Sequence, residues 1–164
     1  MLYLLGIVLL AAFDQVTKML VELNIIPGCA MPVIGNFLML YYTQNRGAAF
    51  GILEGVTPLI IAIPAILSAA CIVLIILRVL HSKLGNLSLM LIAAGGLGNL
   101  IDRVLRGYVV DFIDFDTLRF AIFNFADSCV TIGVLLLIIY VIRYETNSGG
   151  RRKSNGAIFN KRRF

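Results

Sequence analysis

The chain has 164 residues, of which 60% are hydrophobic and 14% are charged, and its mean hydropathy is +0.95. Water-soluble domains usually contain about 45–50% apolar and about 25% charged residues, so the composition excludes an ordinary soluble domain and a disordered chain. Three cysteines without a CxxC spacing indicate neither a disulfide framework nor a zinc site. The composition predicts a small, mainly α, integral membrane protein.

Four apolar runs are long enough to cross a bilayer as helices, since about 20 residues span its hydrocarbon core. The runs are residues 1–21, 56–77, 84–101 and 120–142. No Lys or Arg precedes the first run, so we interpret it as a retained span and not as a cleavable signal peptide. We expect a four-helix transmembrane domain over residues 1–145 and a basic, disordered tail over residues 146–164.

The distribution of Lys and Arg predicts the orientation. The loop after the second run and the C-terminal tail together hold nine basic residues and one acidic residue, whereas the rest holds five basic and eight acidic residues. Because cytoplasmic segments carry the excess of Lys and Arg, we expect both termini in the cytoplasm. Membrane topology and attraction to anionic lipid account for the basic tail, and we expect no nucleic-acid partner.

Two segments outside the runs are rich in β-branched and aromatic residues. They are residues 36–43 and 107–115, and this composition predicts short strands. The predicted orientation puts both on the extracytoplasmic side.

Polar residues of three spans fall at one depth. At about 1.5 Å per residue, Asp14 lies about 20 Å and Asp127 about 24 Å along its helix from the cytoplasmic side. Three polar residues of the third span lie at a similar height or one turn beyond it: Asn99, Asp102 and Arg103. Asp111 follows in the connection to the fourth span. Because ionisable groups are costly in lipid, we expect these side chains to meet inside the bundle, near the outer third of the bilayer.

Simple structural roles explain some of these charges. Asp14 and Lys18 are four residues apart on one helix face, so they can form a buried ion pair without further function. Asn124 and Asp127 have the spacing of a helix capping box. Neither Asp111 nor Asp127 has a Lys or Arg within four residues, so local ion pairing does not explain them.

Two neighbouring carboxylates can share one proton, so that one activates water while the other protonates the substrate. This is the chemistry of an aspartic protease, and it needs no metal and no cofactor. The only histidine, His81, lies on the predicted cytoplasmic side, which argues against Ser–His–Asp and Cys–His schemes. Proton or cation transport would suit the same carboxylates, and a structural membrane subunit is a third hypothesis. The sequence leaves open which aspartate carries the proton.

Four segments of the chain resemble the signature blocks of the lipoprotein signal peptidase (signal peptidase II) family. They are FDQVTK from Phe13, QNRGAAFG from Gln44, GGLGNLIDR from Gly95 with GYVVDF from Gly107, and FNFADS from Phe123. The blocks occur in the order found in the family.

The resemblance implies an aspartic endopeptidase of the bacterial plasma membrane. Such an enzyme removes the signal peptide from diacylglyceryl-modified prolipoproteins by cutting before the lipid-carrying cysteine, near the extracytoplasmic face. The resemblance also implies four transmembrane helices with a small extracytoplasmic β-sheet that holds the substrate. It further implies that globomycin inhibits the protein. We expect a monomer whose partners are prolipoprotein substrates and membrane lipid.

The resemblance also implies roles for individual residues. The catalytic pair falls on Asp111 and Asp127. Substrate binding or support of the pair falls on Asn45, Asn99, Arg103 and Asn124. Structural polar support falls on Asp14, Lys18 and Asp102.

Overall fold

The computed structural model describes residues 1–35, 37–47, 57–115, 118 and 121–160, with side chains through residue 144 except that of Thr57. In chain order the elements are α1 (Leu2–Asn24), β1 (Ala30–Ile34), β2 (Leu38–Asn45), α2 (Thr57–Ile76), α3 (Lys83–Leu105), β3 (Val109–Asp114) and α4 (Phe125–Asn160). The predicted class, four helices with a small sheet, is confirmed.

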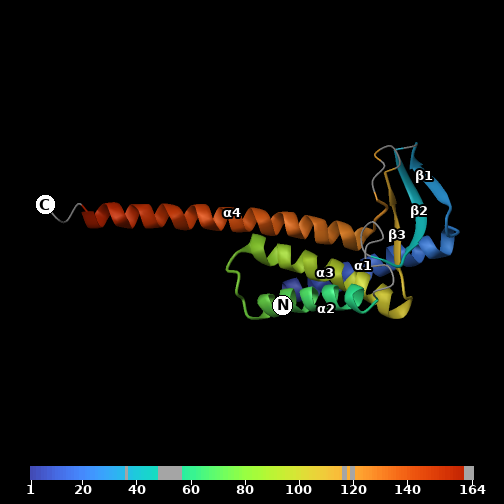
Figure 1. The fold of residues 1–164 in the computed structure, drawn as a ribbon, viewed down its shortest axis with the longest axis horizontal. Helices are drawn as coiled ribbons and strands as arrows, with labels where there is room; N and C mark the ends of the chain where they lie inside the picture. Colours follow the sequence, from blue (N-terminus) through green and yellow to red (C-terminus); the bar gives the residue numbers. More distant parts are fainter. Residues whose placement is uncertain (36, 48–56, 116–117, 119–120, 161–164) are drawn as a thin grey trace.

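Helix α3 is at the centre of the bundle and packs against the other three helices (Figure 1). Within the described residues, four helical segments are long and apolar enough to cross a membrane: Leu2–Asn24, Pro58–Ile76, Lys83–Leu105 and Phe125–Tyr144. They correspond to the four predicted spans. Most of the large exposed apolar side chains lie on these helices, as expected of surfaces that face lipid. The chain is a multi-pass membrane protein.

Two glycines of α3 allow close approach of the neighbouring helices. A Cβ atom at Gly95 would collide with the backbone oxygen of Ala126, and one at Gly98 would collide with the Asp14 carboxylate. Small residues have this effect in membrane bundles because they let helix backbones come close. The first turn of α4, which carries Asp127, therefore lies directly against α3.

One face of α1 is buried along its whole length. Its buried residues are Ile7, Ala11, Asp14, Lys18 and Val21. Spacings of three and four residues put them on one face of the helix. The buried stripe is apolar in the first half of the helix and contains two charges in the second half, so the polar interior lies toward the C-terminal end of α1.

The sheet is antiparallel with strand order β1-β2-β3. Strands β2 and β3 confirm the two predicted strands, whereas β1 was not predicted. Pro32 lowers the strand propensity of that segment, but a residue without a backbone N–H is tolerated on an edge strand. The sheet lies at the end of the bundle opposite the N-terminus, and its strands run across the helix axes (Figure 1).

The register of β2 and β3 sets a contact that matters for the site. Thr43 pairs with Asp111, and Asn45 pairs with Val109. Because alternate residues of a strand share a face, Asn45 and Asp111 are diagonal neighbours on the same face of the sheet.

Helix α4 continues past its apolar part to Asn160, into the segment 146–164 that the sequence predicts to be disordered (Figure 1). The backbone is helical there instead, because a helix that is already nucleated adds residues without a new nucleation cost. The composition of the tail carries no information about this continuation. The boundary between the domain and the tail at residue 145 stays a prediction.

We expect Gly95→Val to destabilise the bundle by about 1–3 kcal/mol, because the new side chain must push α4 away from α3. Thermal unfolding of the purified protein in detergent, followed by circular dichroism, measures the change. Ala12→Val is the matched control because Ala12 is exposed on α1. An equal melting temperature for the two variants would contradict the close packing at Gly95.

Candidate active site

Asp111 lies on β3 and its side chain is almost entirely buried, with 3% of the residue exposed. Its Oδ2 accepts a hydrogen bond from Asn45 Nδ2 at 2.8 Å, and its Oδ1 accepts one from Asn124 Nδ2 at 2.6 Å. Burial and the nearby negative charge of Asp127 raise the pKa of Asp111 to about 6, although both amide donors act to lower it. A carboxyl group with this pKa changes its protonation state near physiological pH.

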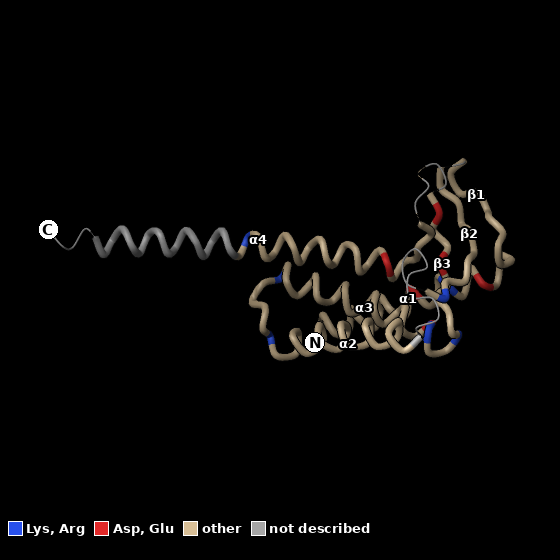
Figure 2. Tube along the Cα trace, in the orientation of Figure 1, with Lys and Arg blue, Asp and Glu red and all other residues tan. Residues whose placement is uncertain are grey.

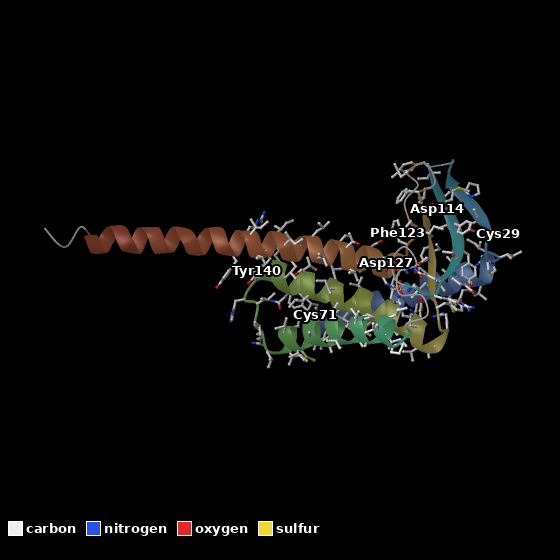
Figure 3. The ribbon with its side chains drawn as sticks, viewed as in Figure 1. Cys29, Cys71, Asp114, Phe123, Asp127 and Tyr140 are labelled. Atoms are coloured by element: carbon white, nitrogen blue, oxygen red, sulfur yellow. The ribbon has the colours of Figure 1, made fainter. Side chains whose placement is uncertain are left out.

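Asp127 is the third residue of α4 and is half-buried. Its backbone N–H donates to Asn124 Oδ1 at 2.9 Å, and the Asn124 N–H donates to Asp127 Oδ2 at 3.1 Å. These reciprocal bonds confirm the predicted capping box. Asn99 Nδ2 donates to the other oxygen, Oδ1, at 2.7 Å. Figure 3 shows Asp127 at the start of α4, beside β3.

Asn124 connects the two aspartates. Its side-chain oxygen caps α4 at Asp127, while its Nδ2 donates to Asp111 and also to Asn99 Oδ1, at 3.1 Å. The capping role and the contact with Asp111 therefore use different atoms of one buried amide. Asn124 can therefore cap α4 and support the Asp111 carboxylate at the same time.

A buried cation lies behind these amides. Lys18 Nζ forms ion pairs with Asp14 at 2.8 Å and Asp102 at 2.9 Å, and it donates to Asn99 Oδ1 at 2.8 Å. The predicted Asp14–Lys18 pair is confirmed, and Asp102 is a second partner. Because an ammonium group can only donate, Asn99 must turn its oxygen toward Lys18, which leaves its NH₂ group for Asp127.

Arg103 joins the end of α3 to the segment after β2. Its Nη1 donates to the Asn99 backbone oxygen at 3.3 Å, and its Nη2 donates to the Gly47 oxygen at 3.2 Å. Residues 48–51, the rest of the motif that begins at Gln44, lie outside the described residues. All nine residues singled out in the sequence analysis thus belong to one hydrogen-bonded region at the sheet end of the bundle.

Comparison with known proteins places the chain among membrane peptidases. Residues 6–143 match the family described as Signal peptidase (SPase) II. The chain belongs to the signal peptidase II family. A lipoprotein signal peptidase of Clostridioides difficile is 40% identical over 148 residues, which cover 90% of this chain and 99% of that protein. One of Streptococcus pneumoniae is 42% identical over 141 residues, which cover 86% and 92%.

Solved structures agree with membership of the signal peptidase II family. One bacterial membrane enzyme, determined by the in meso method at 2.3 Å, superposes with a TM-score of 0.82 at 39% identity, covering 88% of this chain and 90% of that one. A second, at 1.9 Å, gives 0.76 at 40% identity, covering 85% and 91%. The resemblance found in the sequence is confirmed, and the chain is a protease of an aspartic peptidase family.

Two further residues of this polar region were not predicted from the sequence. Gln15 Nε2 donates to Asp102 Oδ1 at 2.9 Å and to the Gly98 oxygen at 3.0 Å. Arg106 Nη1 donates to the same Asp102 oxygen at 2.6 Å, and its Nε donates to Glu22 at 3.2 Å. Arg106 follows Asp102 by four residues, and this helical ion-pair spacing was the signal that could have found it.

Among the residues that the structure describes, no group of three or more His, Cys, Asp or Glu side chains could hold a metal ion. The side chains around the two aspartates are instead amides and cations. Amides and cations can hold a carboxylate in place by donating hydrogen bonds, and a carboxyl group held in this way could exchange a proton with a substrate in acid–base catalysis.

We expect Asn45→Ala to raise the pKa of Asp111 above about 6, because the hydrogen bond from Asn45 stabilises the charged carboxylate. Titration of ¹³C-labelled aspartate carboxyls by NMR in detergent micelles measures the pKa, with Asp111→Asn identifying the signal.

The matched control for this titration is Asn24→Ala. Asn24 bonds the Leu20 backbone oxygen on its own helix and is exposed, so its loss leaves the pKa of Asp111 unchanged. A pKa of Asp111 that stays constant or falls in Asn45→Ala would contradict the assigned contact.

Proposed function

We propose that this chain removes signal peptides from diacylglyceryl-modified prolipoproteins, cutting before the lipid-carrying cysteine, with Asp111 and Asp127 as its catalytic pair. The observation that carries the proposal is the linkage of these two carboxylates through Asn124, which bonds both of them. Two of the similar proteins are lipoprotein signal peptidases, and family membership supports the same class of substrate here.

The environments of the two aspartates suggest different roles. Asp111 is almost fully buried and its pKa is raised to about 6, so it holds a proton more readily than an ordinary carboxyl group. Asp127 lies in the first turn of α4, where the helix dipole favours negative charge, and it accepts bonds from Asn99 and from the Asn124 backbone. We therefore assign Asp127 as the general base and Asp111 as the general acid.

The reaction then follows in two steps. Asp127 takes a proton from water as the water oxygen attacks the scissile carbonyl carbon, and Asp111 gives its proton to the carbonyl oxygen. In the second step the C–N bond breaks, Asp127 donates its proton to the leaving amine, and Asp111 recovers a proton from the tetrahedral intermediate. Both carboxyl groups return to their starting states.

Amide and guanidinium groups around the pair can hold the substrate. Asn45 lies on the sheet face beside Asp111, and Arg103 bonds the backbone at Gly47, so both are at the border of the polar region. We propose that they bind the substrate backbone near the scissile bond. Correct alignment of reacting groups contributes several orders of magnitude to enzymatic rates.

The depth of the site suits a lipid-carrying substrate. Figure 2 shows acidic and basic residues gathered at the sheet end of the helices, while the long central part of the bundle is largely uncharged. The lysines and arginines of the opposite end favour a cytoplasmic location for it, so we propose cytoplasmic termini and a site near the extracytoplasmic face of the plasma membrane. There the two acyl chains stay in the bilayer while the peptide reaches the aspartates.

A single copy of the chain supplies every residue used in this mechanism, so we propose that a monomer is sufficient. The contributing elements are α1, α3, α4, β2 and β3.

We expect Asp111→Asn and Asp127→Asn each to lower kcat for cleavage of a diacylglyceryl-prolipoprotein by at least about a hundredfold, because each removes one proton-transfer group. Gel-shift assays with purified protein in detergent measure the rate. Asp114→Asn, on the same strand as Asp111, is the matched control and retains activity.

The detergent assay also separates peptidase from transporter, since cleavage needs no sealed membrane and no ion gradient. Near-normal cleavage by either Asp111→Asn or Asp127→Asn would contradict the assignment of that residue. Activity that appears only in sealed vesicles with an ion gradient would contradict the peptidase mechanism.

A further inference from the structure

Two backbone amides are held by buried carboxylates at the sheet end of the bundle. The Val110 N–H donates to Asp102 Oδ2 at 3.2 Å, and the Ala126 N–H donates to Asp14 Oδ1 at 2.9 Å. Each amide belongs to the residue immediately before one aspartate of the proposed catalytic pair. One carboxylate thus holds β3 and the other holds the first turn of α4.

One cation joins these two carboxylates. Lys18 Nζ is 2.8 Å from Asp14 Oδ2 and 2.9 Å from Asp102 Oδ2, and all three side chains are at most 1% exposed. Arg106 contributes a second cation, 2.6 Å from Asp102 Oδ1. Arg106 also pairs with Glu22, so the network holds two cations and three carboxylates, and each buried charge has a partner of opposite sign.

The same lysine sets the orientation of an amide beside the catalytic pair. Lys18 donates to Asn99 Oδ1 at 2.8 Å, and this leaves Asn99 Nδ2 to donate to Asp127 Oδ1 at 2.7 Å. Without an obligate donor at Lys18, the amide could turn its oxygen toward the Asp127 carboxylate and repel it.

Stability alone does not account for a buried cluster of this kind. Well-packed apolar residues often stabilise a protein as much as a buried ion pair does or more, because desolvation of the charges is costly. Glycine at position 98 also leaves room for the Asp14 carboxylate against α3. Three buried charges that each contact the backbone or an amide next to an active-site residue indicate a geometric role.

We propose that the Asp14–Lys18–Asp102 cluster is a positioning clamp that fixes β3 relative to the first turn of α4, and so fixes the separation of the two catalytic carboxylates. The effect of the clamp on catalysis rests on the proposed function. The clamp itself consists of contacts to two backbone amides and does not depend on that function. Because its side chains are buried, the clamp acts through the backbone and Asn99, and does not contact the substrate.

The first test compares Lys18→Met on α1 with Lys83→Met, the same substitution at the exposed first residue of α3, far from the sheet. In Lys18→Met we expect kcat to fall by about a hundredfold with little change in KM, since small displacements of reacting groups have effects of this size. Hydrogen exchange measured by mass spectrometry is expected to become faster at the Val110 and Ala126 amides. Lys83→Met changes neither quantity. Unchanged kcat or unchanged exchange in Lys18→Met would overturn the clamp.

The second test separates loss of the accepting oxygen at position 102 from loss of its charge. Asp102→Asn and Asp102→Leu have similar size and remove the same charge, but only asparagine retains an oxygen that accepts the Val110 N–H. We expect faster exchange at Val110 and a lower kcat in the leucine variant than in the asparagine variant. Equal exchange and equal kcat in the two variants would overturn the proposal.

The two readouts distinguish failure of the clamp from failure of the proposed function. Hydrogen exchange reports on the backbone amides without any cleavage. If Asp111→Asn cleaved substrate normally, the proposed catalytic pair would be wrong, while the exchange comparison of the Lys18 and Asp102 variants would still decide whether the clamp exists.

Discussion

A charge inside a bilayer must find its partners within the protein, and this constraint organises the sheet end of the structure. The buried Lys18 ammonium is neutralised by two carboxylates from α1 and α3. The same two carboxylates also accept backbone N–H groups of β3 and α4, the elements that carry the two aspartates. The polar interior is therefore connected from the ion pairs, through Asn99, to the catalytic pair that we propose. The other half of the bundle needs no such network because the core cluster described there consists of apolar residues, with buried serines but no buried charge beside them.

Much of the fold follows from the sequence because the membrane imposes simple rules. Long uncharged runs must be helices, and a fixed rise per residue puts polar side chains from different helices at one depth. Those two rules predicted the four spans and the convergence of Asp14, Asn99 and Asp127. Strand β1 was not predicted because Pro32 interrupts a short segment, although Val33 and Ile34 favour a strand, and because pairing with β2 is a tertiary effect. The helical backbone beyond residue 145 was not predicted either, because the composition of a segment does not show whether a preceding helix continues into it.

The sequence predicted most members of the polar region at the sheet end, without Gln15 and Arg106, but only some of the contacts that join them. Spacing gave the Asp14–Lys18 pair and the capping box at Asn124, but no spacing rule joins Lys18 to Asp102 across two helices. From the sequence, capping and catalysis were competing explanations of Asp127 in its spacing with Asn124. The structure removes that competition, because the oxygen of the amide caps α4 while its NH₂ group bonds Asp111. Single polar residues in a small membrane enzyme can serve both purposes when their two ends face different partners.

In the mechanism that we propose, the Asp111 and Asp127 carboxylates both contact the reacting carbonyl group. The most direct measurement is a crystal structure with a lipopeptide in which a hydroxyethylene group replaces the scissile amide and so mimics the tetrahedral intermediate. The proposed mechanism predicts that the inhibitor hydroxyl lies within hydrogen-bonding distance of both carboxylates. A hydroxyl that contacts neither carboxylate, or only one of them with the other turned away, would contradict it.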